Sequence, residues 1–575
     1  MLDANRPAGR LFVWLLLIAV AVSPGCAQVW VRPAEGYRLF GAFEDSLGAS
    51  DMLSARTRQT LRQLDLEAVC DRNPFDCFVR LQAETERDPQ PDRLFALAEL
   101  SHWLGDQANP SDACAYHYLC AGYAYHYLFD AQAAPVEVTA TPFDPRFRLA
   151  CDLYNAALAK CIRTAQQAGR LDPRERLHLP TPDGQGFSLT VQHHGFAWGP
   201  EEFGPLLLAS DYDAVGLANR HGQYGLGVPL IGTRAAAANA ARDGFFPNAV
   251  SFPVSAFFRF EGGLAELHRR RAGALELYNP LQTAAIQVAG RRVPLESDLS
   301  TPLAYFLANT DLQRADFLGF LRPDKVAAKA GIYMLEPYQR GKIPVLMVHG
   351  LLSSPLTWAP MFNDLRADPE LRERYQFWFY LYPTGPGYLQ AAADLRHDLR
   401  ALRQELDPRG TDLALDHLVL VGHSMGGLVS RLLTADSGDD FFQLVSKRPL
   451  DRLAVDPSVR QELEQVFYFS REPEVGRVVF IGTPHRGSLL GPSLPGRVAA
   501  HFVELPRGLM QSAQELMKLD ATVWTPPTSV DLLSPDSPAL QLLSTRQRPP
   551  DVRFHSIIGK AAPRTVLREL TRPIV

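Results

Sequence analysis

The chain of 575 residues lacks several features that would each point to a particular class of protein. Its formal net charge is only −5, so there is no electrostatic reason to expect a nucleic acid partner, and we predict none. The apolar run at residues 11–22 is shorter than the roughly 20 residues a helix needs to cross a bilayer. No cysteine pair has CxxC spacing and no companion histidine pattern is present, so we predict no metal site. We also expect no cofactor. The length alone favours two to four domains.

The amino terminus reads as a targeting segment. Two arginines precede the apolar run 11–22, which suits the central region of a signal peptide. The following Ser-Pro-Gly-Cys-Ala resembles a bacterial lipobox, although its first two residues depart from the usual pattern. This resemblance implies that residues 1–26 are a signal peptide, that Cys26 carries a lipid, and that the protein is an outer-membrane lipoprotein facing the periplasm or the cell surface. The alternatives are a soluble periplasmic or secreted protein cleaved after Ala27, or an uncleaved anchor.

The remaining cysteines all lie before residue 165. They are Cys70, Cys77, Cys114, Cys120, Cys151 and Cys161. An even number of cysteines in one region of an exported protein favours a disulfide framework, and fifteen pairings are open.

Three segments with different patterns follow the signal peptide. Residues 40–170 carry apolar residues at helical spacing and resemble paired helices of tetratricopeptide-like repeats, without a strict period. Residues 178–335 contain short β-branched and aromatic runs between glycine and proline, which indicates a β-rich segment. Residues 340–575 alternate strands and helices, so we predict an α/β domain with a doubly wound parallel sheet.

A serine lies at one strand-to-helix junction of this third segment. Gly422-His423-Ser424-Met425-Gly426 fits the pattern G-x-S-x-G, with a strand before it and a helix after it. In such a sharp turn, side chains at the glycine positions would clash with neighbouring backbone. The pattern therefore predicts Ser424 as a nucleophile, with Gly422, His423 and Gly426 supporting the turn.

Two main-chain amides are candidates for an oxyanion hole. The amide that follows the nucleophile belongs to Met425, and a second donor normally comes from the loop after an earlier strand. In "VLMVHGLLSS" that strand ends at His349 and Gly350, and the next amide belongs to Leu351. We expect His349 to shape this loop rather than to act as the base.

Three ordered motifs together resemble the α/β-hydrolase superfamily in its esterase and lipase branch. They are the His-Gly loop at 349–350, the "GHSMGG" turn at 422–427 and "GTPHRGS" at 482–488, and the likeness covers about 340–560. The resemblance implies a serine ester hydrolase acting at the cell envelope on an acyl ester, either a lipid or another small-molecule ester.

The carboxyl-terminal end departs from the family pattern, in which an acid and then a histidine follow the serine. After "RFHSIIG" the chain reads "KAAPRTVLRELTRPIV", which contains neither histidine nor aspartate and has Glu569 as its only acid. We therefore expect a hydrolase domain that is truncated and lacks its last strand. The alternative function is a catalytically impaired hydrolase that serves as a non-catalytic envelope binding protein.

None of the histidines or candidate aspartates after Ser424 lies where the family pattern places the catalytic acid and the catalytic histidine. The histidines are His485 in a turn motif, His501 in a helix-like insert and His555 in a strand, and two aspartates, Asp531 and Asp536, lie in "SVDLLSPDSP". We interpret both aspartates as turn and cap residues. The sequence therefore leaves the base and the acid unassigned.

Overall fold

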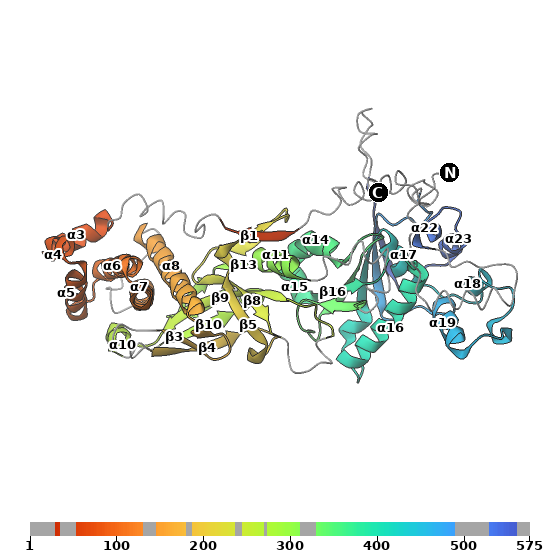
Figure 1. The fold of residues 1–575 in the computed structure, drawn as a ribbon, viewed down its shortest axis with the longest axis horizontal. Helices are drawn as coiled ribbons and strands as arrows, with labels where there is room; N and C mark the ends of the chain where they lie inside the picture. Colours follow the sequence, from red (N-terminus) through yellow and green to blue (C-terminus); the bar gives the residue numbers. More distant parts are fainter. Residues whose placement is uncertain are drawn as a thin grey trace, which may run out of the picture. The chain divides into compact units, whose positions relative to one another are not determined.

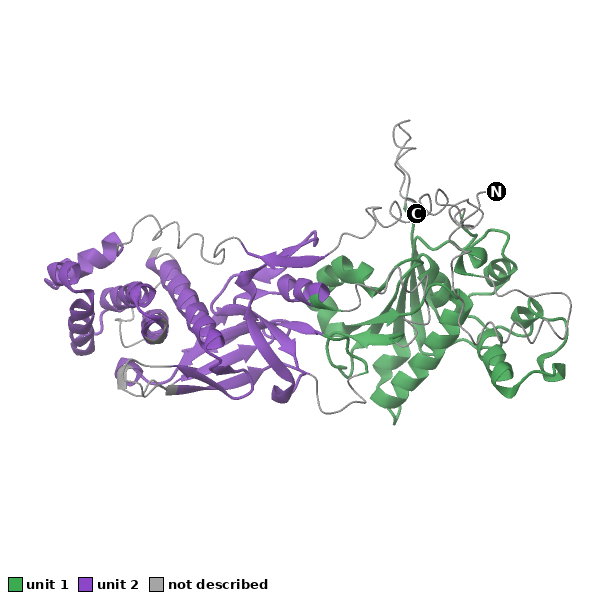
Figure 2. Cartoon of the chain, in the orientation of Figure 1, with its two compact units in different colours: residues 1–28, 244–248, 309–575 green, residues 29–243, 249–308 purple. Residues whose placement is uncertain are grey.

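The computed structural model describes residues 29–34, 53–129, 145–179, 187–235, 244–269, 273–310, 329–488 and 528–559. The chain divides into two compact units, coloured separately in Figure 2. Unit 1 comprises 1–28, 244–248 and 309–575, and unit 2 comprises 29–243 and 249–308. The predicted helical segment and most of the predicted β-rich segment thus share unit 2, whereas residues 244–248 and 309–335 of the β-rich segment belong to unit 1. The predicted domain boundaries themselves stay predictions.

The amino-terminal part of unit 2 is helical, as predicted (Figure 1). Its helices are α3 (Ala55–Gln63), α4 (Glu67–Arg72), α5 (Pro74–Arg87), α6 (Pro91–Gln107), α7 (Pro110–Phe129) and α8 (Pro145–Gln167). Proline is the first residue of α5 and of α6, where its missing N–H costs no intrahelical hydrogen bond. Asn73 caps α5 by accepting a hydrogen bond from the backbone N–H of Asp76. Local sequence signals therefore account for where these helices begin.

The cysteines of this helical part depart from the prediction. Cys70 and Cys77 form a disulfide, whereas Cys114, Cys120, Cys151 and Cys161 are free thiols. The predicted six-cysteine framework is therefore wrong for these four residues. They lie on α7 and α8, and three of them are fully buried in the helix packing, where a free cysteine behaves as a small apolar side chain.

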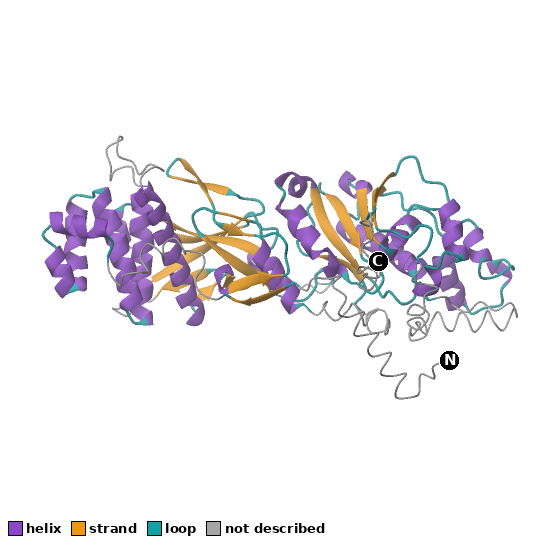
Figure 3. Cartoon of the chain, turned by 90° about the horizontal axis from the view of Figure 1, so that it is seen from above, coloured by secondary structure: helices purple, strands orange, loops and turns teal. Residues whose placement is uncertain are grey.

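A seven-stranded sheet forms the other half of unit 2. Its order is β2 (Leu171–Asp172), β3 (Arg176–Leu179), β4 (Phe187–His194), β10 (Gly273–Tyr278), β9 (Ser251–Phe260), β8 (Val228–Arg234) and β5 (Phe203–Leu208). Neighbouring strands are antiparallel except β4 and β10, which are parallel. Helix α8 contacts β2, β3, β5 and β8 and so covers one face of the sheet (Figure 3). The hydroxyl of Tyr154 on α8 donates to the Phe258 carbonyl at 2.7 Å and joins the two layers.

Shorter elements complete unit 2. They are the ribbons β1 (Trp30–Pro33) with β6 (Tyr212–Val215), β7 (Gly222–Gln223) with β13 (Ser297–Asp298) and β11 (Ala285–Val288) with β12 (Arg291–Pro294), and the helices α10 (Leu264–Arg269) and α11 (Ser300–Asn309).

A buried carboxylate connects α8 to the segment before β8. Glu296 Oε2 accepts hydrogen bonds from Asn155 Nδ2 at 3.1 Å and from the Gly225 N–H at 3.3 Å. The Asn155 side chain in turn accepts from the Gly227 N–H at 2.8 Å. Burial raises the pKa of Glu296 to about 7, because an ionised carboxylate is poorly solvated at this position.

Unit 1 is built on a six-stranded sheet. Its order is β14 (Gly331–Met334), β16 (Tyr375–Leu381), β15 (Ile343–Val348), β17 (Leu418–His423), β18 (Val475–Ile481) and β19 (Arg553–Ile557). All neighbours are parallel except β14 and β16. Among the described residues of this unit the α-helices are α14 (Ala359–Ala367), α15 (Pro369–Arg374), α16 (Tyr388–Leu406), α17 (Met425–Leu432), α18 (Asp440–Gln443), α19 (Pro457–Phe467), α22 (Ser529–Leu532) and α23 (Pro538–Thr545).

Successive side chains of β16 point to opposite faces of the sheet, and helices cover both faces. Trp378 and Tyr380 belong to the core that includes α16, α17 and α19, whereas Phe377 and Phe379 pack against Phe362 of α14. The predicted doubly wound α/β fold is therefore confirmed. Within the described residues, β19 is the last strand along the chain and an edge of the sheet. The predicted absence of a further strand concerns residues after 559, which lie outside the described part.

No helix in the described ranges is long and apolar enough to cross a membrane. The predicted signal peptide and Cys26 lie outside these ranges.

We predict that Glu296→Gln removes a pH dependence from the stability of unit 2. Between about pH 4.5 and 7 the folded state keeps a proton that the unfolded chain has lost, so stability falls as pH rises through this window. Relative to the parent, the variant should gain on the order of 2 kcal/mol in free energy of unfolding between pH 5 and pH 8. Denaturant unfolding at both pH values measures this, and the exposed Glu201→Gln serves as control. An equal effect of both variants would contradict the prediction.

Candidate active site

The serine singled out by the sequence lies between β17 and α17. Ser424 has φ 51° and ψ −120°, a backbone conformation that non-glycine residues seldom adopt. Hydrogen bonds hold this turn on both sides. The Ser424 N–H donates to the Ile481 carbonyl of β18 at 2.9 Å, and the Gly427 N–H donates to the Ser424 carbonyl at 3.0 Å. The strained residue is thus held by the adjacent strand and by its own helix.

The glycines around the serine are required by close backbone packing. A Cβ on Gly426 would lie 2.2 Å from the Val348 carbonyl oxygen at the end of β15. A Cβ on Gly422 would lie 2.5 Å from the Gly426 carbonyl oxygen. Gly427 packs closely against the side chain of Thr483, in the loop that follows β18. These contacts supply the clash that the sequence analysis expected at the glycine positions.

The His-Gly loop after β15 faces the serine. A Cβ built on Gly350 would lie 3.0 Å from Ser424 Cβ and 3.1 Å from His423 Nδ1, so the two loops are in direct contact. Neither the Leu351 amide nor the Met425 amide has a hydrogen-bond acceptor among the described residues. The Met425 amide begins α17, where backbone N–H groups have no intrahelical partner and the helix dipole is positive. Both predicted oxyanion donors therefore belong to the loop and the turn that meet at Ser424.

His349 supports the loop as a neutral residue. Its side chain is fully buried, its Nδ1 lies 3.0 Å from the Gly350 carbonyl oxygen, and its ring stacks on Tyr382 at 4.4 Å. The Tyr382 hydroxyl donates to the His349 carbonyl at 2.7 Å. Burial lowers the pKa of His349 to about 4, so the imidazole carries no charge at neutral pH. No sequence motif pointed to Tyr382, whose only local signal is its position directly after β16.

His423, next to the serine, is also surrounded by packing contacts. Burial lowers its pKa, and its buried Nδ1 has no hydrogen-bond partner in the described structure. Its ring is nearly perpendicular to that of Trp358, with 6.4 Å between the ring centroids. The indole N–H of Trp358 is likewise buried and without a partner among the described residues. No sequence signal identified this tryptophan.

The serine side chain itself is half-buried, so it lies neither in the core nor fully in solvent. Its hydroxyl makes no hydrogen bond to any residue in the described ranges. In particular, none of the described histidines forms a hydrogen bond with it.

The described histidines that follow the serine in the sequence contact residues other than Ser424. The His485 ring packs edge-on against Phe480, 4.5 Å between centroids, and burial followed by the charges of Arg548 and Arg431 lowers its pKa. His555 is exposed on β19, where its Nε2 lies 3.1 Å from Arg477 Nη1. His501 lies outside the described residues, as does Glu569.

Both aspartates singled out by the sequence lie in local turns. Asp531 closes a capping box at the start of α22 by accepting hydrogen bonds from the backbone N–H and the hydroxyl of Thr528. Asp536 is exposed and lies in a turn in which its N–H contacts the Ser534 hydroxyl. Neither carboxylate is bonded to a histidine in the described structure.

Comparison with known proteins agrees with this geometry. Residues 345–567 match the model of the alpha/beta hydrolase family. This segment is an alpha/beta hydrolase domain. The matched range begins within β15 and includes the loop at Gly350, the turn at Ser424 and β19. No curated protein matches the chain.

Solved structures similar to the hydrolase domain include two bacterial enzymes. The lipase BlEst2 of Bacillus licheniformis in mature form is 17% identical over 39% of this chain and 70% of the lipase, with a TM-score of 0.22. Esterase B of Lactobacillus rhamnosis, inhibited by a tributyrin phosphonate, is 19% identical over 39% of this chain and 58% of the esterase, with a TM-score of 0.21. This chain therefore spans less than two thirds of the esterase.

We predict that Gly426→Ala destabilises the hydrolase domain. The added methyl group would overlap the carbonyl oxygens of Val348 and His349, which are backbone atoms at the end of β15 and have little freedom to move. The free energy of unfolding of unit 1 should fall by at least about 2 kcal/mol. Denaturant unfolding followed by tryptophan fluorescence measures the change.

The matched control is Gly476→Ala in β18. The nearest atom to a Cβ there is 3.6 Å away, which is an ordinary contact distance. Equal stability of the two variants would show that the turn is less tightly packed than the structure indicates.

Proposed function

We propose that the hydrolase domain is a serine ester hydrolase in which Ser424 attacks the carbonyl carbon of an acyl ester. The observation that carries the proposal is the strained Ser424 turn packed directly against the His-Gly loop. The conformation costs on the order of 1–3 kcal/mol, and such strain is typical of sites where a side chain must be aimed at a ligand. The match to the alpha/beta hydrolase family supports the same assignment.

The Leu351 and Met425 amides are proposed to stabilise the oxyanion. As Ser424 Oγ bonds to the carbonyl carbon, the carbonyl oxygen becomes negatively charged, and two unpaired N–H groups would donate to it. Both amides are already unpaired in the described structure, so no existing hydrogen bond has to be broken. One such donor contributes roughly 3 kcal/mol of transition-state stabilisation in known serine hydrolases.

The proton of the Ser424 hydroxyl must pass to a base as the bond forms. The described histidines do not contact Ser424 Oγ, so we assign the base to none of them. This is the observation that favours the second candidate function, a catalytically impaired hydrolase that binds at the envelope without turnover. Even without a complete triad, oxyanion donors and binding leave a residual acceleration of roughly 10³ to 10⁴ over water.

The site of action is proposed to be the bacterial cell envelope. The proposal follows from the sequence alone, through the predicted signal peptide and the lipid-bearing Cys26. The substrate class is proposed to be a lipid-like or other acyl ester, by resemblance of the three motifs to the esterase and lipase branch.

We predict that a fluorophosphonate probe labels the full chain and that Ser424→Ala abolishes the labelling. The probe forms a covalent bond only with an activated serine, so labelling reports the nucleophile without knowledge of the substrate. Hydrolysis of a short-chain nitrophenyl ester should fall at least about 10³-fold in the same variant. Gel fluorescence and absorbance measure the two effects.

The control is Ser544→Ala, which removes an exposed hydroxyl on α23 and should leave both signals unchanged. Folded parent protein that neither binds the probe nor hydrolyses the ester would exclude the enzyme and favour the non-catalytic function.

A further inference from the structure

Strand β1, labelled in Figure 1, pairs with β6 to form a two-stranded antiparallel ribbon in unit 2. One face of this ribbon combines an exposed tryptophan with exposed arginines. Trp30 and Arg32 lie two residues apart on β1, so their side chains point to the same side. Their partners across the ribbon are Val215 and Asp213. We call these four residues, together with Arg220, the ribbon face.

Three of the side chains on the ribbon face are exposed to solvent. Trp30 is 48% exposed, although tryptophan is usually among the more buried side chains. The side chains of Arg32 and Arg220 are 55% and 57% exposed, whereas that of Asp213 is only 7% exposed.

The ribbon face carries more positive than negative charge. Arg32 Nη2 lies 3.4 Å from the Asp213 carboxylate and Arg220 Nη1 lies 4.0 Å from it, so two guanidinium groups share one carboxylate. The carboxylate is covered and the guanidinium groups reach solvent, which leaves positive charge beside the indole ring. Tryptophan with arginine is the combination that favours the interface of a lipid bilayer, because the ring is amphipathic and the cations meet phosphate groups.

A lipid on Cys26 would hold the ribbon face close to a bilayer, because Cys26 is only a few residues before β1. Trp30 lies four positions after Cys26. A fully extended chain covers at most about 14 Å over four positions. The headgroup region of one leaflet is itself roughly 5–8 Å thick. A lipid on Cys26 inserted in the leaflet therefore holds the start of β1 close to the headgroups.

We propose that the ribbon face lies on the headgroups of an anionic phospholipid leaflet and orients unit 2 on the membrane. The proposal rests on the lipid anchor put forward above and not on the chemistry at Ser424. A second copy of the chain is a less suitable occupant, since a two-fold pairing of ribbon faces would bring the exposed guanidinium groups of both copies together.

The test uses the full lipidated chain, reconstituted in vesicles of phosphatidylethanolamine and phosphatidylglycerol with or without bromine on the acyl chains near the headgroup. Bromine quenches only nearby tryptophans. Subtraction of the Trp30→Phe spectrum from the parent spectrum isolates the emission of Trp30. We expect bromine to reduce this emission at least twofold.

The aromatic control moves the tryptophan to another exposed position. Phe75 is 55% exposed on α5, which lies away from β1 in unit 2 (Figure 1). In the double variant Trp30→Phe/Phe75→Trp the emission of the new tryptophan should be unquenched. Equal quenching at positions 30 and 75 would overturn the proposal.

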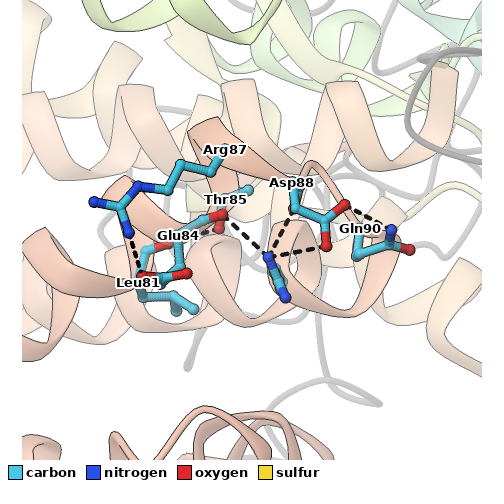
Figure 4. Close-up of polar contacts among 7 residues, drawn as sticks. Leu81, Glu84, Thr85, Arg87, Asp88 and Gln90 are labelled. Atoms are coloured by element: carbon cyan, nitrogen blue, oxygen red, sulfur yellow. Dashed lines mark hydrogen bonds and ion pairs between the residues drawn. The ribbon is translucent and has the colours of Figure 1, made fainter.

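The charge control compares two arginines that are each paired with a carboxylate. Arg32→Glu should at least halve the quenched fraction of the Trp30 emission, because a carboxylate is repelled by phosphatidylglycerol. Arg87 is 74% exposed and binds Glu84 at 2.8 Å at the end of α5 (Figure 4), so Arg87→Glu makes the same change in charge elsewhere. Arg87→Glu should leave the quenching unchanged, and Arg32→Gln checks that the effect does not come from misfolding. Equal quenching in Arg32→Glu and Arg87→Glu would overturn the electrostatic part.

Mass spectrometry of the amino-terminal peptide separates the possible failures. A lipid on Cys26 with unquenched Trp30 excludes the ribbon face as a membrane contact. Absence of a lipid overturns the proposal too, because the tether is then missing. Labelling of Ser424 is measured independently, so neither result bears on the proposed hydrolase.

Discussion

Close contact between the first turn of α17 and the end of β15 is the constraint on which the candidate site depends. The backbone of Gly426 lies against the carbonyl groups that end β15, so no side chain fits there. This contact brings the loop at Gly350 against Ser424 and leaves the serine a positive φ. The pairing of β17 with both β15 and β18 holds the turn, because a strained residue persists only where its surroundings leave it no alternative.

The electrostatics of the site follow from the same packing. The two amides at the turn and the loop are unpaired in the described structure. The fully buried His349 is uncharged at neutral pH, and burial also lowers the pKa of the half-buried His423. The candidate site therefore has two unpaired N–H groups at the places where the proposed mechanism needs hydrogen-bond donors. In that proposed mechanism the fixed dipoles of these amides would stabilise the oxyanion. A proton acceptor would have to come from elsewhere in the chain.

The sequence predicted the parts of this fold that depend on local pattern. The apolar spacing of α16 is an example, since Leu395, Leu399 and Leu402 are all buried on one side of that helix. The cysteines are the counterexample. Their number and position suggested a framework, but whether two thiols meet depends on how α7 and α8 pack, and this is a tertiary contact. The parallel pairing of β4 with β10 likewise joins segments far apart in the chain and has no local signal.

The sequence by itself determined the strand, the glycine-bounded turn and the helix around Ser424, because all three are contiguous and each has a short-range signature. It also determined the alternation of strands and helices that makes unit 1 an α/β domain. Only the tertiary structure decided that the Gly350 loop meets the serine and that the described histidines do not. Both outcomes depend on the order of strands in the sheet and on side-chain packing between distant segments, and residue spacing along the chain carries no information about either.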